Sequence, residues 1–205
     1  MSRYLKTKEL ADYMLPLLVC DESNWEYYLD FSSKHYKYPF YDQVMIFAQR
    51  SDAIACADFD TWNKVLHRSV NKGAKGIALP REGISGGYLQ YVFDVSDTND
   101  RNGRTFSLWQ YQDIHEDAVQ ESLNDTFGEI EEYKNMNEFI SSIVSITVAD
   151  HYSDYYASLS DANQVTDMDD HTHREKFTAV LFESVRHCVL SRMNLRSETS
   201  FSEAN

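Results

Sequence analysis

Residues that could bind phosphate stand in a short glycine–lysine segment, Lys72-Gly-Ala-Lys-Gly76. Gly73 and Gly76 let the backbone approach a phosphate closely, and Lys72 and Lys75, three positions apart, can straddle it. The segment is not a Walker A loop, because no G-x-x-x-x-G-K-[ST] pattern occurs in the chain. The alternative interpretation is a plain glycine-rich connection from helix to strand, whose lysines are only solvated.

The residues around this segment form a basic strip in an otherwise acidic chain. Residues 62–81 contain five basic side chains and no acidic one, although the formal net charge of the whole chain is −14. A local strip of this kind favours phosphate contacts, whereas the acidic remainder disfavours long-range attraction of nucleic acid. The members of the basic strip are Lys64, Arg68, Lys72, Lys75 and Arg81.

A second segment, Lys34-His-Tyr-Lys-Tyr-Pro-Phe-Tyr41, interleaves cations with aromatic rings. This combination binds single strands, because rings stack on bases while cations follow the phosphates. Aromatic rings at a junction between two helices also commonly belong to the core. We therefore expect Tyr36 and Phe40 to be buried, and Lys34, Lys37 and Tyr38 to be available to a nucleic acid.

Acidic and imidazole side chains gather over residues 167–175. A metal-dependent nuclease would need such a cluster, and His171 and His173 could chelate an ion from a loop or strand, although not from one helix face. N-capping by Asp169 or Asp170 explains the same acids without an ion. We expect no metal and no cofactor. Because the chain has no nucleophile elbow, kinase signature or typical Cys–His spacing, we expect a binding protein rather than an enzyme.

Length and composition fit one soluble domain or two small ones. The chain has 205 residues, and its three cysteines (Cys20, Cys56 and Cys188) form no C-x-x-C pair and leave an odd thiol, so a disulfide framework is not expected. The longest apolar stretch, Leu15–Cys20, is too short to cross a bilayer, and the first residues contain neither the h-region nor the small-residue cleavage site of a signal peptide. We expect a cytoplasmic protein with no membrane partner.

Hydrophobic periodicity predicts an α+β fold that is mostly α-helical, with a small antiparallel sheet in the middle of the chain, at about residues 75–111. Trp62 and Trp109 are expected in the core. The expected helices cover 6–18 with Pro16 in the last turn, 25–36 capped by Ser23 or Asn24, 41–49, a segment from Phe59 capped by Asp58, 116–127, 139–159 and 177–195. The expected strands are one that begins with 77–79, one over 88–95 and, after a turn over 97–103, one over 105–111.

The same patterns predict the domain organisation. An N-terminal helix over residues 1–24 precedes an α+β region over 25–111. A helical region over 112–195 is expected to pack on it as one compact unit, with a polar mobile loop over 158–173 between its last two helices. Residues 196–205 are expected to form a disordered tail.

Several motifs together resemble a known family. They are Tyr38–Arg50, Ala55–Ala57, Phe59–Trp62 and Val70–Leu79, continued by Tyr91–Thr98, Gly103–Thr105, Leu108–Gln110 and the helix Phe177–Leu195. They resemble the N-terminal domain of large accessory proteins on conjugative elements and plasmids of Gram-positive bacteria. That domain is itself similar to the single-stranded-DNA-binding N-terminal domain of ArdC-type antirestriction proteins. The metalloprotease-like H-E-x-x-H motif of ArdC-type proteins does not occur in this chain.

The resemblance implies a mobile-element protein that binds single-stranded nucleic acid, DNA or RNA, and helps incoming DNA evade host defence. An alternative is an anti-CRISPR or antirestriction inhibitor that binds the defence nuclease or its guide RNA, with residues 105–205 (19 acidic, 6 basic) imitating a nucleic acid. A third, weaker hypothesis is a nuclease built on residues 167–175. The residues predicted to contact nucleic acid are Lys34, Lys37, Tyr38, Lys64, Arg68, Lys72, Gly73, Lys75, Gly76 and Arg81.

Overall fold

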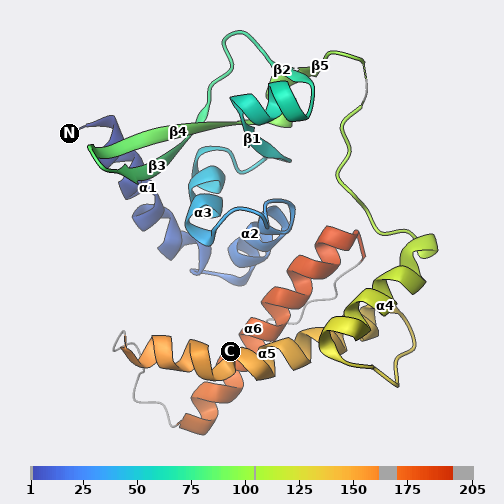
Figure 1. Cartoon of the computed structure of the whole chain (residues 1–205). Helices are drawn as coiled ribbons and strands as arrows, with labels where there is room; N and C mark the ends of the chain where they lie inside the picture. Colours follow the sequence, from blue (N-terminus) through green and yellow to red (C-terminus); the bar gives the residue numbers. More distant parts are fainter. Residues whose placement is uncertain (1, 104, 162–169, 196–205) are drawn as a thin grey trace. The chain divides into compact units, whose positions relative to one another are not determined.

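The computed structural model describes residues 2–103, 105–161 and 170–195 (Figure 1). These residues form two compact units, Met1–Trp109 and Gln110–Asn205, called here the N-terminal and the C-terminal unit. The chain is 61% helical with small antiparallel sheets in mid-chain, which confirms the predicted α+β, mostly helical class. The packing of the helical region on the α+β region stays a prediction.

Three helices open the N-terminal unit: α1 (Arg3–Leu18), α2 (Glu22–Lys34) and α3 (Phe40–Gln49). Pro16 lies in the last turn of α1, as predicted, and Pro39 directly precedes α3. The carboxylate of Asp21 accepts a hydrogen bond from the Asn24 backbone N–H at 2.8 Å, so Asp21 caps α2. The predicted cap at Ser23 or Asn24 is therefore wrong, and α2 begins three residues earlier than expected.

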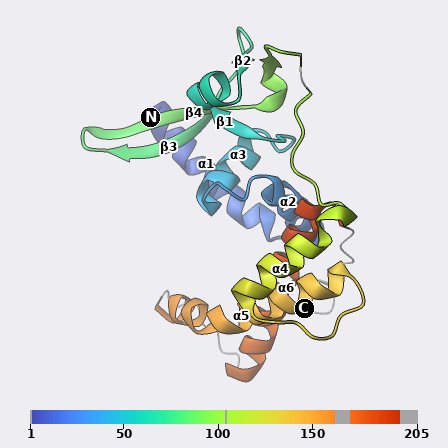
Figure 2. The ribbon, with the colours of Figure 1, turned by 45° about the vertical axis from the view of Figure 1, so that its right-hand side comes forward.

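The strands of the N-terminal unit form two antiparallel sheets. One has the order β1 (Cys56–Asp58), β4 (Gly86–Asp94), β3 (Ile77–Gly83), and the other pairs β2 (Arg68–Val70) with β5 (Thr98–Asp100). Figure 2 shows β3 and β4 as a long hairpin. Residues 105–111 contain no strand, so the third predicted strand is wrong; β5 instead forms inside the turn predicted after β4.

A helical segment joins β1 to β2. Its π-helical turn η1 covers Thr61–Val65, and the carboxylate of Asp58 accepts a hydrogen bond from the Thr61 backbone N–H at 2.7 Å, which confirms the predicted cap. Trp62 is 1% exposed and its indole N–H donates to the Phe93 carbonyl at 2.8 Å. Trp62 is thus a core residue, whereas Trp109 is 49% exposed and its predicted burial is wrong.

The core of the N-terminal unit lies between α3 and the three-stranded sheet. Val44, Met45 and Ile46 of α3 are fully buried and belong to one cluster with Leu79 and Val92 of the sheet. The free edge of β3 is closed by a side chain: the Gln49 amide accepts from the Ala78 N–H and donates to the Ala78 carbonyl, both at 2.9 Å. The N–H and carbonyl of Ala78 would otherwise be free to pair with a strand of another chain. By binding both groups, Gln49 stabilises the sheet within a single chain.

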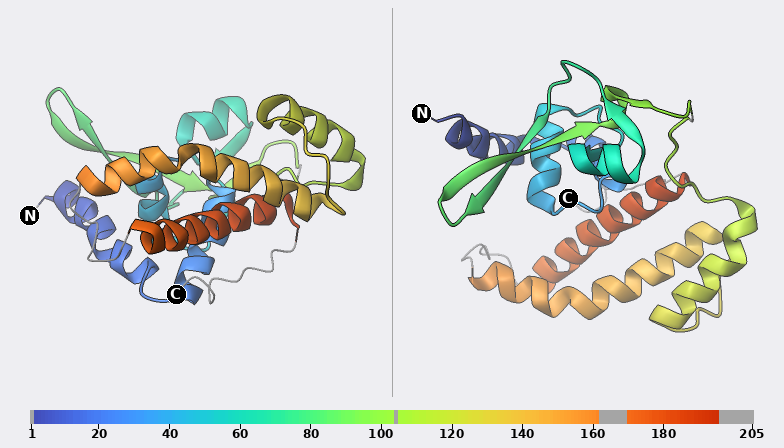
Figure 3. Two further views of the ribbon diagram at one scale, coloured as in Figure 1. Left: turned by 90° about the horizontal axis from the view of Figure 1, so that it is seen from below. Right: turned by 45° about the horizontal axis from the view of Figure 1, so that its top comes forward.

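The C-terminal unit is built from α4 (Glu116–Phe127), α5 (Met136–Asp161) and α6 (Asp170–Met193) (Figure 3). The core is made mainly by α5 and α6, where Phe139 and Leu190 are fully buried. The predicted bounds of α4 are confirmed. The predicted loop over 158–173 is wrong at both ends, because α5 and α6 continue there. The middle of this loop, residues 162–169, and the predicted tail over 196–205 lie outside the described residues. No helix in the described part of the chain is long and apolar enough to cross a membrane.

Candidate nucleic-acid interface

The predicted phosphate-binding segment lies in a loop, residues 71–76, that joins β2 to β3. The Ala74 N–H donates to the Asn71 carbonyl at 3.1 Å, which closes a four-residue turn. Gly73, at the third position of this turn, has φ +90°, a conformation that favours glycine. The Asn71 N–H donates to the Asp97 carbonyl at 2.8 Å, and the Asn99 side chain donates to the Asn71 side chain at 2.5 Å. The start of the loop is therefore fixed to the segment that carries β5.

The end of this loop lies against an exposed aromatic ring. A Cβ placed on Gly76 would be 3.0 Å from Cδ1 of Tyr91 and 3.2 Å from Cζ of Phe93, closer than side chains normally pack. Tyr91 pairs with Ala78 and lies on the same sheet face as Phe93, opposite Val92. Because position 76 is glycine, the backbone that follows Lys75 can lie directly beside the Tyr91 ring, which is 36% exposed.

A cation from the first turn of α1 lies over the same ring. The guanidinium carbon of Arg3 is 5.7 Å from the centroid of Tyr91. This end of α1 is held on the β3–β4 hairpin, because Glu82 accepts hydrogen bonds from the Tyr4 hydroxyl at 2.9 Å and from Lys8 Nζ at 3.1 Å.

Gly87 contributes to the same arrangement. A Cβ at this position would be 2.2 Å from Cζ of Tyr4, so glycine lets the Tyr4 ring lie on the hairpin backbone. Figure 2 shows the start of α1 beside this hairpin.

Lys72 and Lys75 are the cations of the basic strip that remain available. Both side chains are exposed, and no hydrogen bond or ion pair joins either one to another described residue. Lys64 is also exposed, but its Nζ lies 2.9 Å from Asp60, one turn earlier in the chain. The loop thus carries two unpaired lysines, and its last residue, Gly76, lies against the ring that Arg3 also contacts.

The two arginines of the basic strip have structural roles instead, which corrects their assignment as phosphate ligands. Arg68 is buried; its Nε donates to the Thr98 hydroxyl at 2.7 Å and its guanidinium lies 3.6 Å from Asp100. Arg81 donates from both terminal nitrogens to the two oxygens of Asp42, each at 2.7 Å. A phosphate would need the guanidinium groups of Arg68 and Arg81, which already lie against the carboxylates of Asp100 and Asp42.

Three rings of the aromatic segment, Tyr36, Tyr38 and Phe40, have the reverse of their predicted exposure. Tyr36 is 57% and Phe40 52% exposed, whereas Tyr38 is half-buried and its hydroxyl donates to the Cys56 carbonyl at 2.9 Å. Burial raises the pKa of Tyr38, so this hydroxyl stays neutral. Tyr38 is therefore a structural residue, and the rings that this segment offers to a ligand are Tyr36 and Phe40.

The cations of the aromatic segment are exposed, as predicted. Lys34 lies in the last turn of α2, and Nζ of Lys37 lies 5.9 Å from the centroid of Tyr36. No described contact joins either lysine to the loop over 71–76, so the structure does not bring the two predicted basic segments together.

The acidic and imidazole segment is partly helical. His171 and His173 both lie on α6, where Nδ1 of His171 is 3.5 Å from Glu175, while Asp167 and Asp169 lie outside the described residues. Within residues 2–103, 105–161 and 170–195, no three His, Cys, Asp or Glu side chains lie close enough together to hold a metal ion.

The half-buried thiol of Cys56 offers no nucleophile. Burial raises the pKa of Cys56 to about 12, so this thiol stays protonated at neutral pH.

Two residues of this candidate site, Arg3 and Tyr91, were not predicted from the sequence. The pattern of the predicted strand over 88–95 could have identified Tyr91, because alternation puts Tyr91 and Phe93 on one face and Val92 on the other. No local pattern connects Arg3 with Tyr91, since 88 positions separate them and only the packing of α1 brings them together.

No protein-family model, no curated protein sequence and no solved structure matches this chain.

Proposed function

We propose that the N-terminal unit binds single-stranded nucleic acid at Tyr91 and the loop over 71–76. The observation that carries the proposal is the contact of Gly76 with the exposed ring of Tyr91, in a loop that also carries the unpaired cations Lys72 and Lys75. An exposed ring can stack on a base, and the adjacent cations can follow the phosphates on either side of it. Arg3, above the same ring, adds a third cation.

The biological role that we propose follows from the resemblance to ArdC-type and conjugative-element domains. In this role the protein acts in the cytoplasm of a recipient cell and protects the DNA of an incoming plasmid or mobile element from host defence. The loop over 71–76 and Tyr91 on β4 both lie in motifs that carry this resemblance, so the resemblance and the proposed interface coincide there. The proposal requires no metal, no cofactor and no catalytic step.

Fluorescence anisotropy with labelled single-stranded DNA, duplex DNA and single-stranded RNA tests this function. We expect the single strands to bind more tightly than the duplex, and the affinity to fall between 50 and 200 mM salt, because phosphate contacts release counterions. Tyr91→Leu should reduce the affinity by about 5- to 100-fold, which corresponds to the loss of one stacked base.

Tyr88→Leu is the matched control for Tyr91→Leu. Tyr88 lies three positions earlier on β4, is 54% exposed and faces the opposite side of the sheet, so its replacement should leave the affinity unchanged. Equal losses in both variants, or no binding of any nucleic acid by the folded wild-type protein, would overturn the proposed function.

A specific observation favours a second candidate function, the direct inhibition of a defence nuclease. Asp117, Glu121 and Asp125 follow one another at four-residue intervals on α4, and all three are exposed. Their spacing along the helix axis is about 6 Å, and no ion pair joins them to a described cation. We call these three residues the acidic row. A basic groove that normally holds a nucleic acid could accept such a row.

A further inference from the structure

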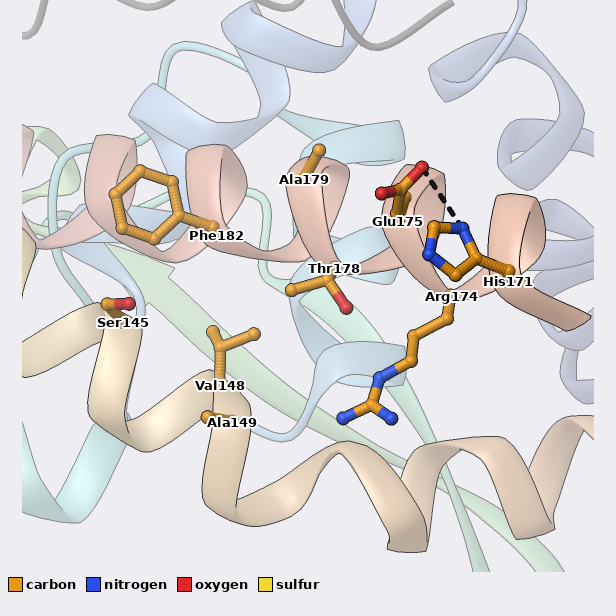
Figure 4. Close-up of a pocket in the computed structure, with 9 residues that line it drawn as sticks. All are labelled: Ser145, Val148, Ala149, His171, Arg174, Glu175, Thr178, Ala179 and Phe182. Carbon is orange, nitrogen blue, oxygen red and sulfur yellow. Dashed lines mark ion pairs between the residues drawn. The ribbon is translucent and has the colours of Figure 1, made fainter.

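An open groove between α5 and α6 has the composition of a ligand pocket (Figure 4). Its volume is about 760 Å³, within the range of about 300–1,000 Å³ typical of small-molecule sites. Much of its lining is apolar: Val148 and Ala149 come from α5, and Ala179 and Phe182 come from α6. All the residues that line the groove belong to the C-terminal unit.

The groove also contains a cation that no described acid neutralises. Arg174 extends from α6 across the groove toward α5 (Figure 4), and its guanidinium carbon lies 4.7 Å from the centroid of Tyr152. No hydrogen bond or ion pair joins this guanidinium to another described residue. The ring of Tyr152 holds the planar group in place but leaves its N–H donors unused.

The acid that lines the groove lies beside an imidazole of its own helix, with which it forms an ion pair only when that imidazole is protonated. Glu175 lies 3.5 Å from Nδ1 of His171, one turn earlier on α6. The hydroxyl of Thr178, one turn after Arg174, points into the groove, and no hydrogen bond joins it to a described residue. The groups still available to a ligand at this end of the groove are therefore a guanidinium and a hydroxyl, which together suit an anionic oxygen.

We propose that this groove binds an amphipathic organic anion. The apolar body lies on Val148 and Phe182, and the carboxylate or phosphate head accepts hydrogen bonds from Arg174 and Thr178. Residues 105–205 carry 19 acidic and 6 basic side chains, so the unit as a whole repels anions. Binding of an anion here consequently depends on Arg174, which makes the proposal sharply testable. It concerns the C-terminal unit and is independent of nucleic-acid binding by the N-terminal unit.

Isothermal titration calorimetry of the full chain with decanoate, decyl phosphate and decyltrimethylammonium tests the site, below the micelle-forming concentration of each. We expect at least one of the two anions to bind and the cation not to bind. The anion that binds more tightly identifies the head group. Arg174→Gln should weaken binding of that anion by about tenfold or more, because a charge-assisted hydrogen bond is lost.

Two further variants separate this site from general charge effects. Lys176→Gln removes a neighbouring exposed cation that does not line the groove, so the affinity should stay unchanged. Ala149→Trp fills the groove from an exposed position and should abolish binding. Circular dichroism checks that each variant is folded, and methyl NMR shifts of Val148 in the wild-type protein locate the ligand even if Ala149→Trp does not fold.

The proposal is overturned by any of three results: no heat with either anion at millimolar concentration, equal binding of the cation, or an unchanged affinity in folded Arg174→Gln. Binding that leaves the Val148 methyl shifts unaltered would also overturn it, because the anion would then occupy another part of the molecule.

Discussion

Arg81 binds Asp42 through two parallel hydrogen bonds of 2.7 Å, which join β3 to α3 across 39 positions of the chain. The Asp42 side chain is only 7% exposed, and that of Arg81 is 28% exposed. Planar pairs of this kind are specific for arginine, because its fork matches a carboxylate. The pair therefore holds the β3–β4 hairpin against α3.

Arg81→Met should therefore destabilise the protein. The substitution leaves the Asp42 carboxylate nearly buried without its partner, and we expect the free energy of unfolding to fall by about 2–3 kcal/mol, less than for a fully buried pair because Arg81 is partly hydrated. Urea denaturation measures the change. Lys75→Met deletes an exposed charge in the same region and should stay within about 0.5 kcal/mol of wild type. Equal effects of the two substitutions would contradict a structural role for Arg81.

Gly76→Ala tests the close approach of the loop to Tyr91. The added methyl group would lie 3.0 Å from the ring, so the ring or the loop must move, at a cost of about 1–3 kcal/mol. We expect nucleic-acid affinity to fall together with stability. In the background of Tyr91→Ala the same substitution should cost somewhat less stability, because the ring atom at 3.0 Å is gone while Cβ of residue 91 at 3.1 Å and Cζ of Phe93 at 3.2 Å remain. Additive losses in this double-mutant cycle would show that the contact does not couple the two residues.

Charge reversal of both unpaired lysines should weaken nucleic-acid binding without unfolding the protein. Lys72 and Lys75 are exposed, and no described residue pairs with them, so Lys72→Glu with Lys75→Glu removes only contacts with a ligand. For a single strand, the slope of log affinity against log salt should decrease by about 0.7 for each lost phosphate contact. An unchanged affinity and slope in the folded double variant would exclude this loop from the interface.

Sequence patterns predicted the parts of the fold that local periodicity determines. The helix over 116–127 has its predicted bounds. Asp58 caps the helical segment that begins at Phe59, as predicted. The short strands β2 and β5 were not predicted, because three residues are too few to establish an alternation. Thr105–Tyr111 contains aromatic and apolar residues typical of strands but forms none, since a strand also needs a neighbouring edge to pair with.

The candidate site was predicted only in part, for a similar reason. Lys72, Lys75 and the two glycines of the loop follow from local composition. The partners that remove Arg68 and Arg81 from the site, Asp100 and Asp42, lie 32 and 39 positions away. The contact of Arg3 with Tyr91 is equally distant. Charge counting along a sequence cannot separate a cation that binds a ligand from one that a distant acid already holds.

His35 should make the stability of the N-terminal unit depend on pH. Burial lowers the pKa of His35 below its usual value of about 6.5. Two smaller effects raise this pKa: the hydrogen bond between Nδ1 and the Phe31 carbonyl, at 2.9 Å, and the charge of Asp94. The Nε2 of His35 is buried, and no described residue forms a hydrogen bond with it. As the pH falls below about 6.5, the unfolded chain takes up a proton that the folded protein does not, so folding loses stability.

We expect the free energy of unfolding to fall by at most about 1.4 kcal/mol per pH unit from this group between pH 7 and 5. Urea denaturation at pH 7.5, 6.5 and 5.5 measures it. His35→Gln should flatten the profile. A wild-type profile retained in His35→Gln would assign the dependence to other groups.

The acidic row on α4 separates the two candidate functions. Glu121 has Asp117 one turn before it and Asp125 one turn after it, so Glu121→Lys converts two repulsive i,i+4 pairs into attractive ones. Each attractive pair stabilises a helix by about 0.2–0.5 kcal/mol, so this variant should be slightly more stable than wild type.

Under the proposed function, nucleic-acid binding and protection of incoming DNA should be unchanged in Glu121→Lys, because the row is then only a solvated face. Conjugation of a plasmid into recipients with and without a restriction or CRISPR system measures protection, and Glu131→Lys, an exposed acid outside the row, is the control. Loss of protection in Glu121→Lys alone, with folding and nucleic-acid binding preserved, would favour direct inhibition of a defence nuclease by the acidic row.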